Sequence, residues 1–232
     1  MAFPFAAPGA HVLYEAQGGS VQPGRDQIPG SASDWQTVQN FVAIRNNDGQ
    51  IIWGSNEVPL VQLGDINLGK WQPVAHIERP HIFSWVMNNY WFTNFRASQE
   101  GDFRFSYYLT STTDSTNTSA TRFGHGARVA LVARVLPPGK PTAAEPSRSV
   151  LAAKDATSLV LLSARPASDL DGVVLHLREV DGRSVPLLLD PSSAATVQSA
   201  EAVNVLEQPM AASTAGLVIG PYETKFVKLR SD

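Results

Sequence analysis

The stretch of sequence that decides the fold class is Phe103-Arg104-Phe105-Ser106-Tyr107-Tyr108-Leu109. Its first, third, fifth and seventh side chains are apolar or aromatic, and more polar groups stand between them. A period of two is typical of a half-buried strand in an antiparallel sheet. The stretch therefore predicts a β-strand that turns one face toward a core.

Comparable short runs of β-branched and aliphatic residues recur along the chain, bounded by turn residues. They are 41–45, 50–53, 129–135, 159–163, 173–177 and 226–229. Asp-Gly pairs, which favour tight hairpins, stand beside several of them, at Asp48-Gly49, Asp171-Gly172 and Asp181-Gly182. Evidence for helices is thin, because Gly or Pro interrupts every longer window with apolar residues at helical spacing. The sequence predicts an all-β fold built on an antiparallel β-sandwich.

A proline-rich stretch divides the chain, with four prolines between Pro137 and Pro146. All five tryptophans, at 35, 53, 71, 85 and 91, precede it, whereas the part after about residue 150 is aliphatic. Two different cores follow from this contrast. We expect a large β-sandwich over 1–136, a connector over 137–149 and a small C-terminal β-domain over 150–232. The polar tract Thr110 to Thr121 predicts a long mobile loop.

Composition excludes several classes of protein. The 232 residues are 43% hydrophobic and only 17% charged, which argues against disorder and against a coiled coil. The net charge of −3, without a basic run, argues against a nucleic-acid partner. No stretch approaches the 18 or so apolar residues of a membrane span, so no membrane partner is expected. Without cysteine the compartment stays open, with the cytoplasm favoured.

Three aspartates, Asp26, Asp34 and Asp65, lie in polar, glycine-bearing stretches near aromatic residues, a setting that suits a carbohydrate site. The competing interpretation, which we favour, is that they cap turns. His76, Glu78 and His81 form the one histidine cluster, and strand alternation would place His76 and Glu78 on one face. This permits metal binding without indicating it, and surface histidines are the favoured interpretation. The sequence assigns no catalytic and no metal-binding residue.

The segment from His81 to Gln99 interleaves aromatic residues with amide and hydroxyl side chains. Aromatic rings can bind the apolar face of a sugar ring, and Asn and Thr can hydrogen-bond to its hydroxyls. The alternative is structural, with the aromatic rings filling a sandwich core and the asparagines satisfying a turn. The candidates for carbohydrate contact are Trp85, Asn88, Asn89, Trp91, Thr93 and Asn94.

Spaced blocks of the chain resemble a known family. They are FPFA at 3–6, GRDQIPGSASDWQTVQNFVAI at 24–44, PLVQLGDINLGKWQ at 59–72, FSWVMNNYWFTNFRASQEGDFRFSYYLTS at 83–111, DGVVLHLREVDGR at 171–183, AVNVLEQP at 202–209 and GPYETKFVKL at 220–229. In this order they resemble the C-terminal β-sandwich region of bacterial glycoside hydrolase family 38, the α-mannosidases. Several blocks in one order are more specific than any single motif.

The resemblance implies a galactose-mutarotase-like supersandwich followed by a small β-domain. It also implies a catalytic barrel, N-terminal to this chain, that holds a zinc ion and an aspartate nucleophile. The family's zinc-ligand pair His-x-Asp is absent from this sequence, so no cofactor is expected in this chain. The chain is interpreted as a fragment that is inactive alone, with the catalytic domains of the same protein as its partners and a mannoside as a possible ligand.

The expected function is therefore the non-catalytic C-terminal portion of an α-mannosidase-type glycosidase, which supports the catalytic barrel. One alternative is a stand-alone carbohydrate-binding module that uses the Trp85 to Asn94 block. Another is an independent sugar enzyme such as an epimerase, which would need paired histidine and glutamate side chains in one cleft. The supporting role predicts an exposed apolar patch where the chain meets its partner domains.

Overall fold

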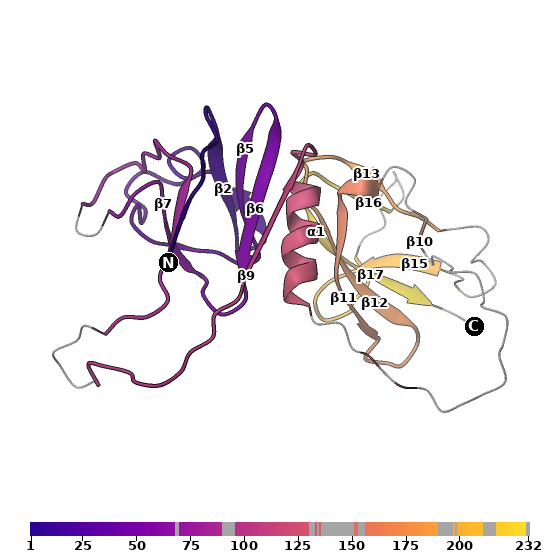
Figure 1. The fold of residues 1–232 in the computed structure, drawn as a ribbon. Coiled ribbons are helices and arrows are strands. Elements are labelled where there is room, and N and C mark those ends of the chain that lie inside the picture. Colours follow the sequence, from indigo (N-terminus) through magenta and orange to yellow (C-terminus); the bar gives the residue numbers. More distant parts are fainter. Residues whose placement is uncertain are drawn as a thin grey trace. The chain divides into compact units, whose positions relative to one another are not determined.

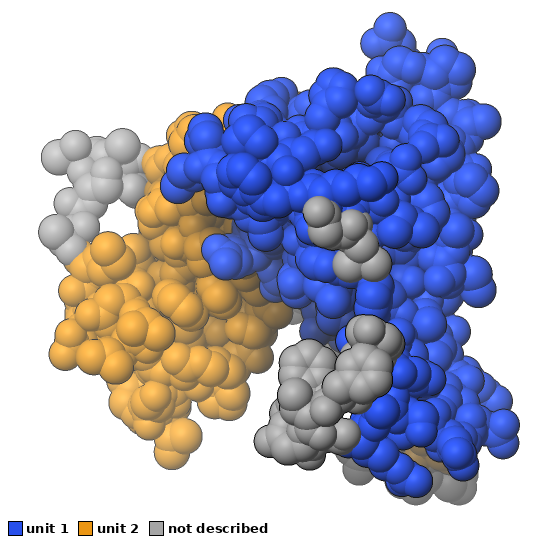
Figure 2. All heavy atoms as spheres, turned by 90° about the vertical axis from the view of Figure 1, so that its left-hand side faces the viewer, with its two compact units in different colours: residues 1–130 blue, residues 131–232 orange. Residues whose placement is uncertain are grey.

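The computed structural model describes residues 1–67, 70–89, 96–129, 133, 135, 151–152, 156–189, 197, 199–210 and 217–230. The chain forms two compact units, unit 1 from Met1 to Ala130 and unit 2 from Leu131 to Asp232 (Figures 1 and 2). The whole predicted connector 137–149 and most of the predicted strand 129–135 lie outside the described residues. None of the helices in the described part has the length and apolar character needed to cross a membrane.

Unit 1 contains two antiparallel sheets. The first has five strands in the order β3-β2-β5-β6-β9. Their bounds are Gly19–Val21, His11–Ala16, Val42–Asn46, Gly49–Ser55 and Tyr107–Thr112. The second has four strands in the order β1-β8-β7-β4, with bounds Ala2–Pro4, His81–Ser84, Leu60–Leu63 and Gln36–Thr37. The hairpin of β5 and β6 turns at the predicted Asp-Gly pair.

One apolar core joins the inner faces of the two sheets. It contains Val12, Tyr14, Val42, Ile44 and Trp53 from the five-stranded sheet, and Val61, Leu63 and Ile82 from the other. Phe3 of β1 enters this core, with its ring edge-on to Trp53 at 5.6 Å and to Tyr107 at 4.9 Å. Two sheets that share a core of alternating inward residues form the predicted β-sandwich.

The prediction of a long mobile loop over Thr110 to Thr121 is wrong. β9 continues to Thr112, and an α-helix, α1, spans Asn117–Arg128. Its first turn is capped by Thr116, whose side chain accepts a hydrogen bond from the Ser119 N–H at 3.2 Å. Ala120 and Phe123 of the helix pack on Phe41, Leu13, Ala43 and Ile52, the outer face of the five-stranded sheet. The helix thus adds a third layer to the sandwich (Figure 1).

The strand expected at Phe103–Leu109 is shifted. Phe103 and Phe105 precede β9, and their rings stack 6.4 Å apart. Tyr107 and Leu109 lie in the strand and share the core side, since Leu109 pairs with Trp53. Leu109 stays half-exposed because β9 is the edge strand of its sheet.

Unit 2 is built mainly of β-strands. Its four-stranded antiparallel sheet has the order β11-β12-β17-β15, with bounds Leu159–Pro166, Val173–Glu179, Thr224–Arg230 and Ser199–Val203. Two short pairs accompany it: β10 (Leu151–Ala152) with β14 (Leu188–Leu189), and β13 (Val185–Pro186) with β16 (Val218–Ile219). A short 3-10 helix, η1, spans Ala156–Ser158. Seven buried aliphatic residues, including Leu175, Leu177, Ile219 and Val227, form the main core on one face.

Candidate carbohydrate-contact surface

Trp85, the first residue of the candidate block, directly follows β8. Its backbone N–H donates to the Leu60 carbonyl at 3.0 Å, which extends the pairing of β8 with β7 by one residue. The indole ring meets that of Trp35 edge to face, with centroids 4.3 Å apart and planes at 88°. Both side chains are half-buried. Trp85 therefore has a packing role and keeps part of its surface accessible.

The structure places only half of the six candidates. Asn88 and Asn89 are exposed and lie three and four residues after Trp85. Trp91, Thr93 and Asn94 lie outside the described residues. Whether the whole block gathers at one point is therefore a prediction that stays open.

Two further tryptophans belong to the same end of unit 1. Trp35 packs on Trp85, and the Ser33 hydroxyl, two residues before Trp35, accepts a hydrogen bond from the Gln72 N–H at 3.2 Å. Trp71, next to Gln72, is 65% exposed. We call residues 22–35, 70–75 and 85–89 the tryptophan loops. Trp35 and Trp71 are not among the sequence-predicted candidates, because the contacts that link their loops join segments distant in sequence.

The tryptophan loops also carry exposed aliphatic residues. The Gly30 N–H donates to the Pro73 carbonyl at 2.7 Å and fastens the first two loops together. Ile28, two residues before Gly30, is 80% exposed, and Val74, which follows Pro73, is 47% exposed. These two loops therefore expose Ile28, Val74 and the Trp71 indole to solvent, side chains that suit contact with a sugar ring or with another polypeptide.

Asp26 and Asp65 stabilise turns, as the favoured interpretation predicted. An Asp26 carboxylate oxygen accepts the Gln22 N–H at 2.8 Å. Asp65 accepts the Ile66 N–H at 2.8 Å and pairs with Arg79 at 2.6 Å. The backbone hydrogen bond and the Arg79 guanidinium lower the pKa of Asp65, so this carboxyl group is a poor proton donor near neutral pH.

The histidines do not form a cleft with carboxylates. His76 lies in a loop rather than in a strand, and its Nε2 is 3.4 Å from Glu78 Oε1 with both side chains about three-quarters exposed. His81 lies in β8, in the four-stranded sheet, and His125 lies in α1, on the outer face of the other sheet. Among the residues that the structure describes, no three side chains of His, Cys, Asp or Glu gather to hold a metal. The independent-epimerase alternative required such a cleft and is therefore dropped.

Two hollows of unit 1, of about 450 and 630 Å³, lie elsewhere. The smaller is lined by the β5–β6 hairpin and by the end of β9. The larger lies beside Tyr14, Gln39, Asn56 and Arg128. Among the described residues, no tryptophan lines either hollow.

Comparison with known proteins identifies the fold. No family model matches the chain, and no curated protein matches it. The structure is similar to that of an alpha-mannosidase from Enterococcus faecalis V583, with a TM-score of 0.60 and 12% sequence identity over 100% of this chain and 25% of that chain. It is also similar to a protein in the glycosyl hydrolase family 38 from Enterococcus faecalis, with a TM-score of 0.59 and 12% identity over 100% of this chain and 26% of that chain.

The likeness includes both units of the chain. This chain spans about a quarter of the length of each matched structure. At 12% identity the likeness shows the fold alone, and the expected all-β sandwich fold is confirmed.

Proposed function

We propose that this chain is the non-catalytic β-domain portion of a glycosidase of the α-mannosidase type, and that it supports the catalytic portion of that enzyme. The observation that carries the proposal is that the structural likeness covers 100% of this chain. It covers 25% of the chain of an alpha-mannosidase structure. The ordered sequence blocks at 24–44, 59–72 and 83–111 support the same family. In this proposal the chain packs against the catalytic portion and supplies no catalytic residue to it.

In this proposal the catalytic chemistry belongs to polypeptide outside this chain. Such an enzyme would hold its zinc ion and nucleophile in the catalytic portion, and we assign neither to a residue of this chain. His76 and Glu78 lie beside each other on an exposed loop, a setting in which solvent screens their interaction.

Hydrolysis of 4-nitrophenyl α-D-mannopyranoside tests the proposal. We expect the purified chain, with zinc chloride added, to release 4-nitrophenol no faster than buffer does. The DNA directly upstream of the Met1 codon should encode the catalytic portion. Turnover by the chain alone that follows it through chromatography would contradict the proposal, as would upstream DNA that encodes an unrelated protein.

We further propose that the tryptophan loops contact carbohydrate, with Trp71 as the most accessible ring. Two findings favour this: the 65% exposure of Trp71, and the hydrogen bond between Gln72 and Ser33 that links its loop to that of Trp35. An exposed indole on a fastened loop can stack on a pyranose ring at little entropic cost. The residues of the Trp85 block, including Trp91, remain candidates in this proposal.

Titration of the isolated chain with mannose and mannobiose tests carbohydrate contact. We expect millimolar binding that Trp71→Ala or Trp91→Ala weakens at least fivefold while the circular dichroism spectrum stays unchanged. Phe103→Ala is the control, because Phe103 is an exposed aromatic residue of unit 1 outside the tryptophan loops. Binding that is absent, or that all three variants retain, would leave the supporting role as the function and remove the carbohydrate contact.

A further inference from the structure

Two loops of unit 2 present aliphatic side chains to solvent. One, residues 167–172, joins β11 to β12, and the other, residues 204–209, follows β15. Leu170 is 86% exposed, Leu206 is 73% exposed and Val205 is 68% exposed. Single exposed aliphatic residues are common on protein surfaces, whereas three on two joined loops are a candidate contact site. We call Leu170, Val205 and Leu206 the loop-tip surface.

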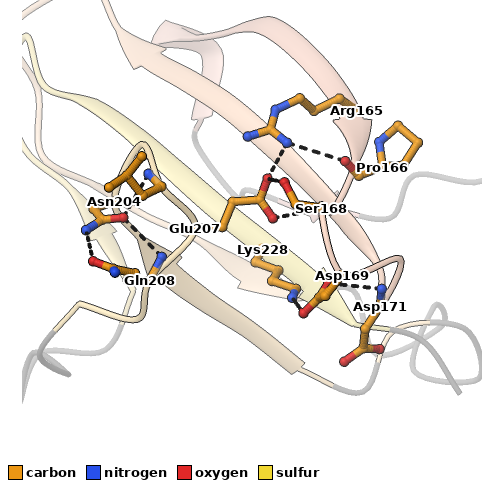
Figure 3. A network of polar contacts seen from close by, with 10 residues as sticks. Arg165, Pro166, Ser168, Asp169, Asp171, Asn204, Glu207, Gln208 and Lys228 are labelled. Carbon is orange, nitrogen blue, oxygen red and sulfur yellow. Dashed lines mark hydrogen bonds and ion pairs between the residues drawn. The ribbon is translucent and has the colours of Figure 1, made fainter.

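Glu207 fastens the two loops to each other. Its carboxylate accepts the Ser168 N–H at 2.8 Å and the Ser168 hydroxyl at 2.7 Å, and it pairs with Arg165 (Figure 3). The Glu207 side chain is only 8% exposed. The hydrogen bonds from the Ser168 N–H and hydroxyl, and to a smaller extent the one from Arg165, lower the pKa of Glu207 to about 2. The carboxylate is therefore ionised at neutral pH and links the two loops through its hydrogen bonds.

Each loop is also fixed internally. The Asn204 side-chain oxygen accepts the N–H groups of Leu206 and Gln208 at 2.9 and 3.0 Å (Figure 3). In the other loop, Asp169 accepts the Asp171 N–H at 3.1 Å and pairs with Lys228 at 2.6 Å. The Lys228 side chain is 3% exposed, which anchors the loop to β17. The aliphatic tips are thus held on rigid supports.

The backbone at the tips is strained. Leu170 and Glu207 have φ angles of 62° and 63°, in the left-handed region that favours glycine or asparagine. Such a conformation is unfavourable for a residue with a Cβ atom. A leucine at 86% exposure contributes little core packing to offset this cost. Strain combined with exposed apolar surface points to a contact outside unit 2.

We infer that the loop-tip surface docks on an apolar surface of the catalytic portion of the glycosidase. This inference rests on the proposed function. The charged groups around the tips are already paired, Arg165 with Glu207, Lys228 with Asp169, and Arg230 with Asp171 at 3.2 Å. Compensated charge gives no attraction for nucleic acid or another polyanion, and an aliphatic tip offers no ring for a sugar.

The occupant follows from length and chemistry. The chain spans about a quarter of the structures that it matches, so three-quarters of such an enzyme is additional polypeptide. An aliphatic, charge-compensated and preorganised surface matches the core of a protein interface, where charged residues are depleted. A polypeptide surface of the same enzyme therefore fits the loop tips better than a small polar ligand does.

Binding to the separately expressed polypeptide that is encoded upstream of Met1 tests the inference. We expect Leu170→Asp combined with Leu206→Asp to weaken binding at least tenfold. Both side chains are exposed, and aspartate tolerates the left-handed backbone at position 170, so the fold should survive. The control is Leu161→Asp, on β11 of the same unit at 50% exposure, which should change affinity less than twofold.

Each other outcome overturns the inference in a distinguishable way. Equal binding by the wild type and the double variant leaves the proposed function intact but removes the docking surface. Failure of the wild type to bind removes both. If sedimentation shows a wild-type dimer that the same substitutions dissociate, the occupant is a second copy. If Leu206→p-benzoylphenylalanine crosslinks to residues 1–130 of its own chain, the occupant is unit 1.

Discussion

The indole rings of Trp35 and Trp85 meet edge to face, with centroids 4.3 Å apart and planes at 88°. The two residues are 50 positions apart in the sequence. Trp85 directly follows the last residue of β8, and Trp35 directly precedes the first residue of β4. Their contact joins two of the tryptophan loops across the four-stranded sheet, whose order is β1-β8-β7-β4. Trp85 therefore has a structural task whether or not the surface beside it binds sugar.

The edge-to-face contact predicts energetic coupling between the two tryptophans. In a double-mutant cycle with Trp35→Ala and Trp85→Ala, the coupling energy should be about 0.5–1.5 kcal/mol, the range for such aromatic pairs. Urea unfolding of the four proteins provides the measurement. If the two losses of stability simply add, the rings do not support each other and the loop arrangement is different.

A methyl group added at Gly124 should have a large effect on the stability of unit 1. A Cβ atom there would lie 2.7 Å from the Asn40 carbonyl oxygen and 3.1 Å from the Phe41 Cβ. Gly124→Ala should therefore destabilise unit 1 by about 1–3 kcal/mol, the usual cost of overpacking, despite the higher helix propensity of alanine.

Gly126, in the same helix, is the matched control for Gly124. A Cβ atom at Gly126 would meet nothing within 4 Å. Gly126→Ala should stabilise the protein by up to about 1 kcal/mol, because only the propensity term changes. Thermal unfolding of the two variants separates the effects, and equal shifts in Tm would mean that α1 does not pack closely on Asn40 and Phe41.

Thr116 should contribute to the stability of α1 through its cap. Thr116→Ala removes the acceptor of the Ser119 N–H, and loss of such a cap typically costs about 1 kcal/mol. Thr113→Ala, at an exposed residue just before the helix, is the comparison. Chemical unfolding should show a loss for the first substitution and almost none for the second; equal stabilities would place the helix start elsewhere.

The contribution of Glu207 to the stability of the fold should decrease as the pH falls. Its pKa falls from an ordinary value of 4.5 to about 2 in the folded chain, so between these values the unfolded state binds more protons. Its stabilisation is complete above about pH 5 and is lost as the pH falls toward 2. The stability gap between wild type and Glu207→Gln, from urea unfolding, should be largest at pH 6 and should shrink steadily by pH 3. A gap that does not change with pH would show that the carboxylate is not held by Ser168 and Arg165.

Much of the strand pattern could be predicted from the sequence. The runs at 159–163, 173–177 and 226–229 lie within β11, β12 and β17, because alternation and burial in a sheet act locally. The helix α1 was missed for a physical reason. Its sequence NTSATRFGHGAR contains two glycines and few apolar residues, so its stability depends on packing of Ala120 and Phe123 on the sheet.

The candidate site was less predictable than the fold. Residue chemistry identified Trp85, but the partners of that ring come from loops that are remote in sequence, through the Trp35 ring and the Ser33–Gln72 hydrogen bond. The loop-tip surface left no clear pattern either. Leu170 and Leu206 are recognisable only from exposure and backbone conformation, which no spacing in the sequence encodes.

Reconstitution with the catalytic portion tests whether this chain supports it. The polypeptide encoded upstream of Met1 is expressed alone and titrated with this chain, while binding heat and hydrolysis of 4-nitrophenyl α-D-mannopyranoside are followed. We expect saturable binding with one chain per catalytic portion, and a rise in activity or thermal stability that saturates at the same ratio. If the catalytic portion neither binds this chain nor gains activity or stability from it, the chain has no supporting role.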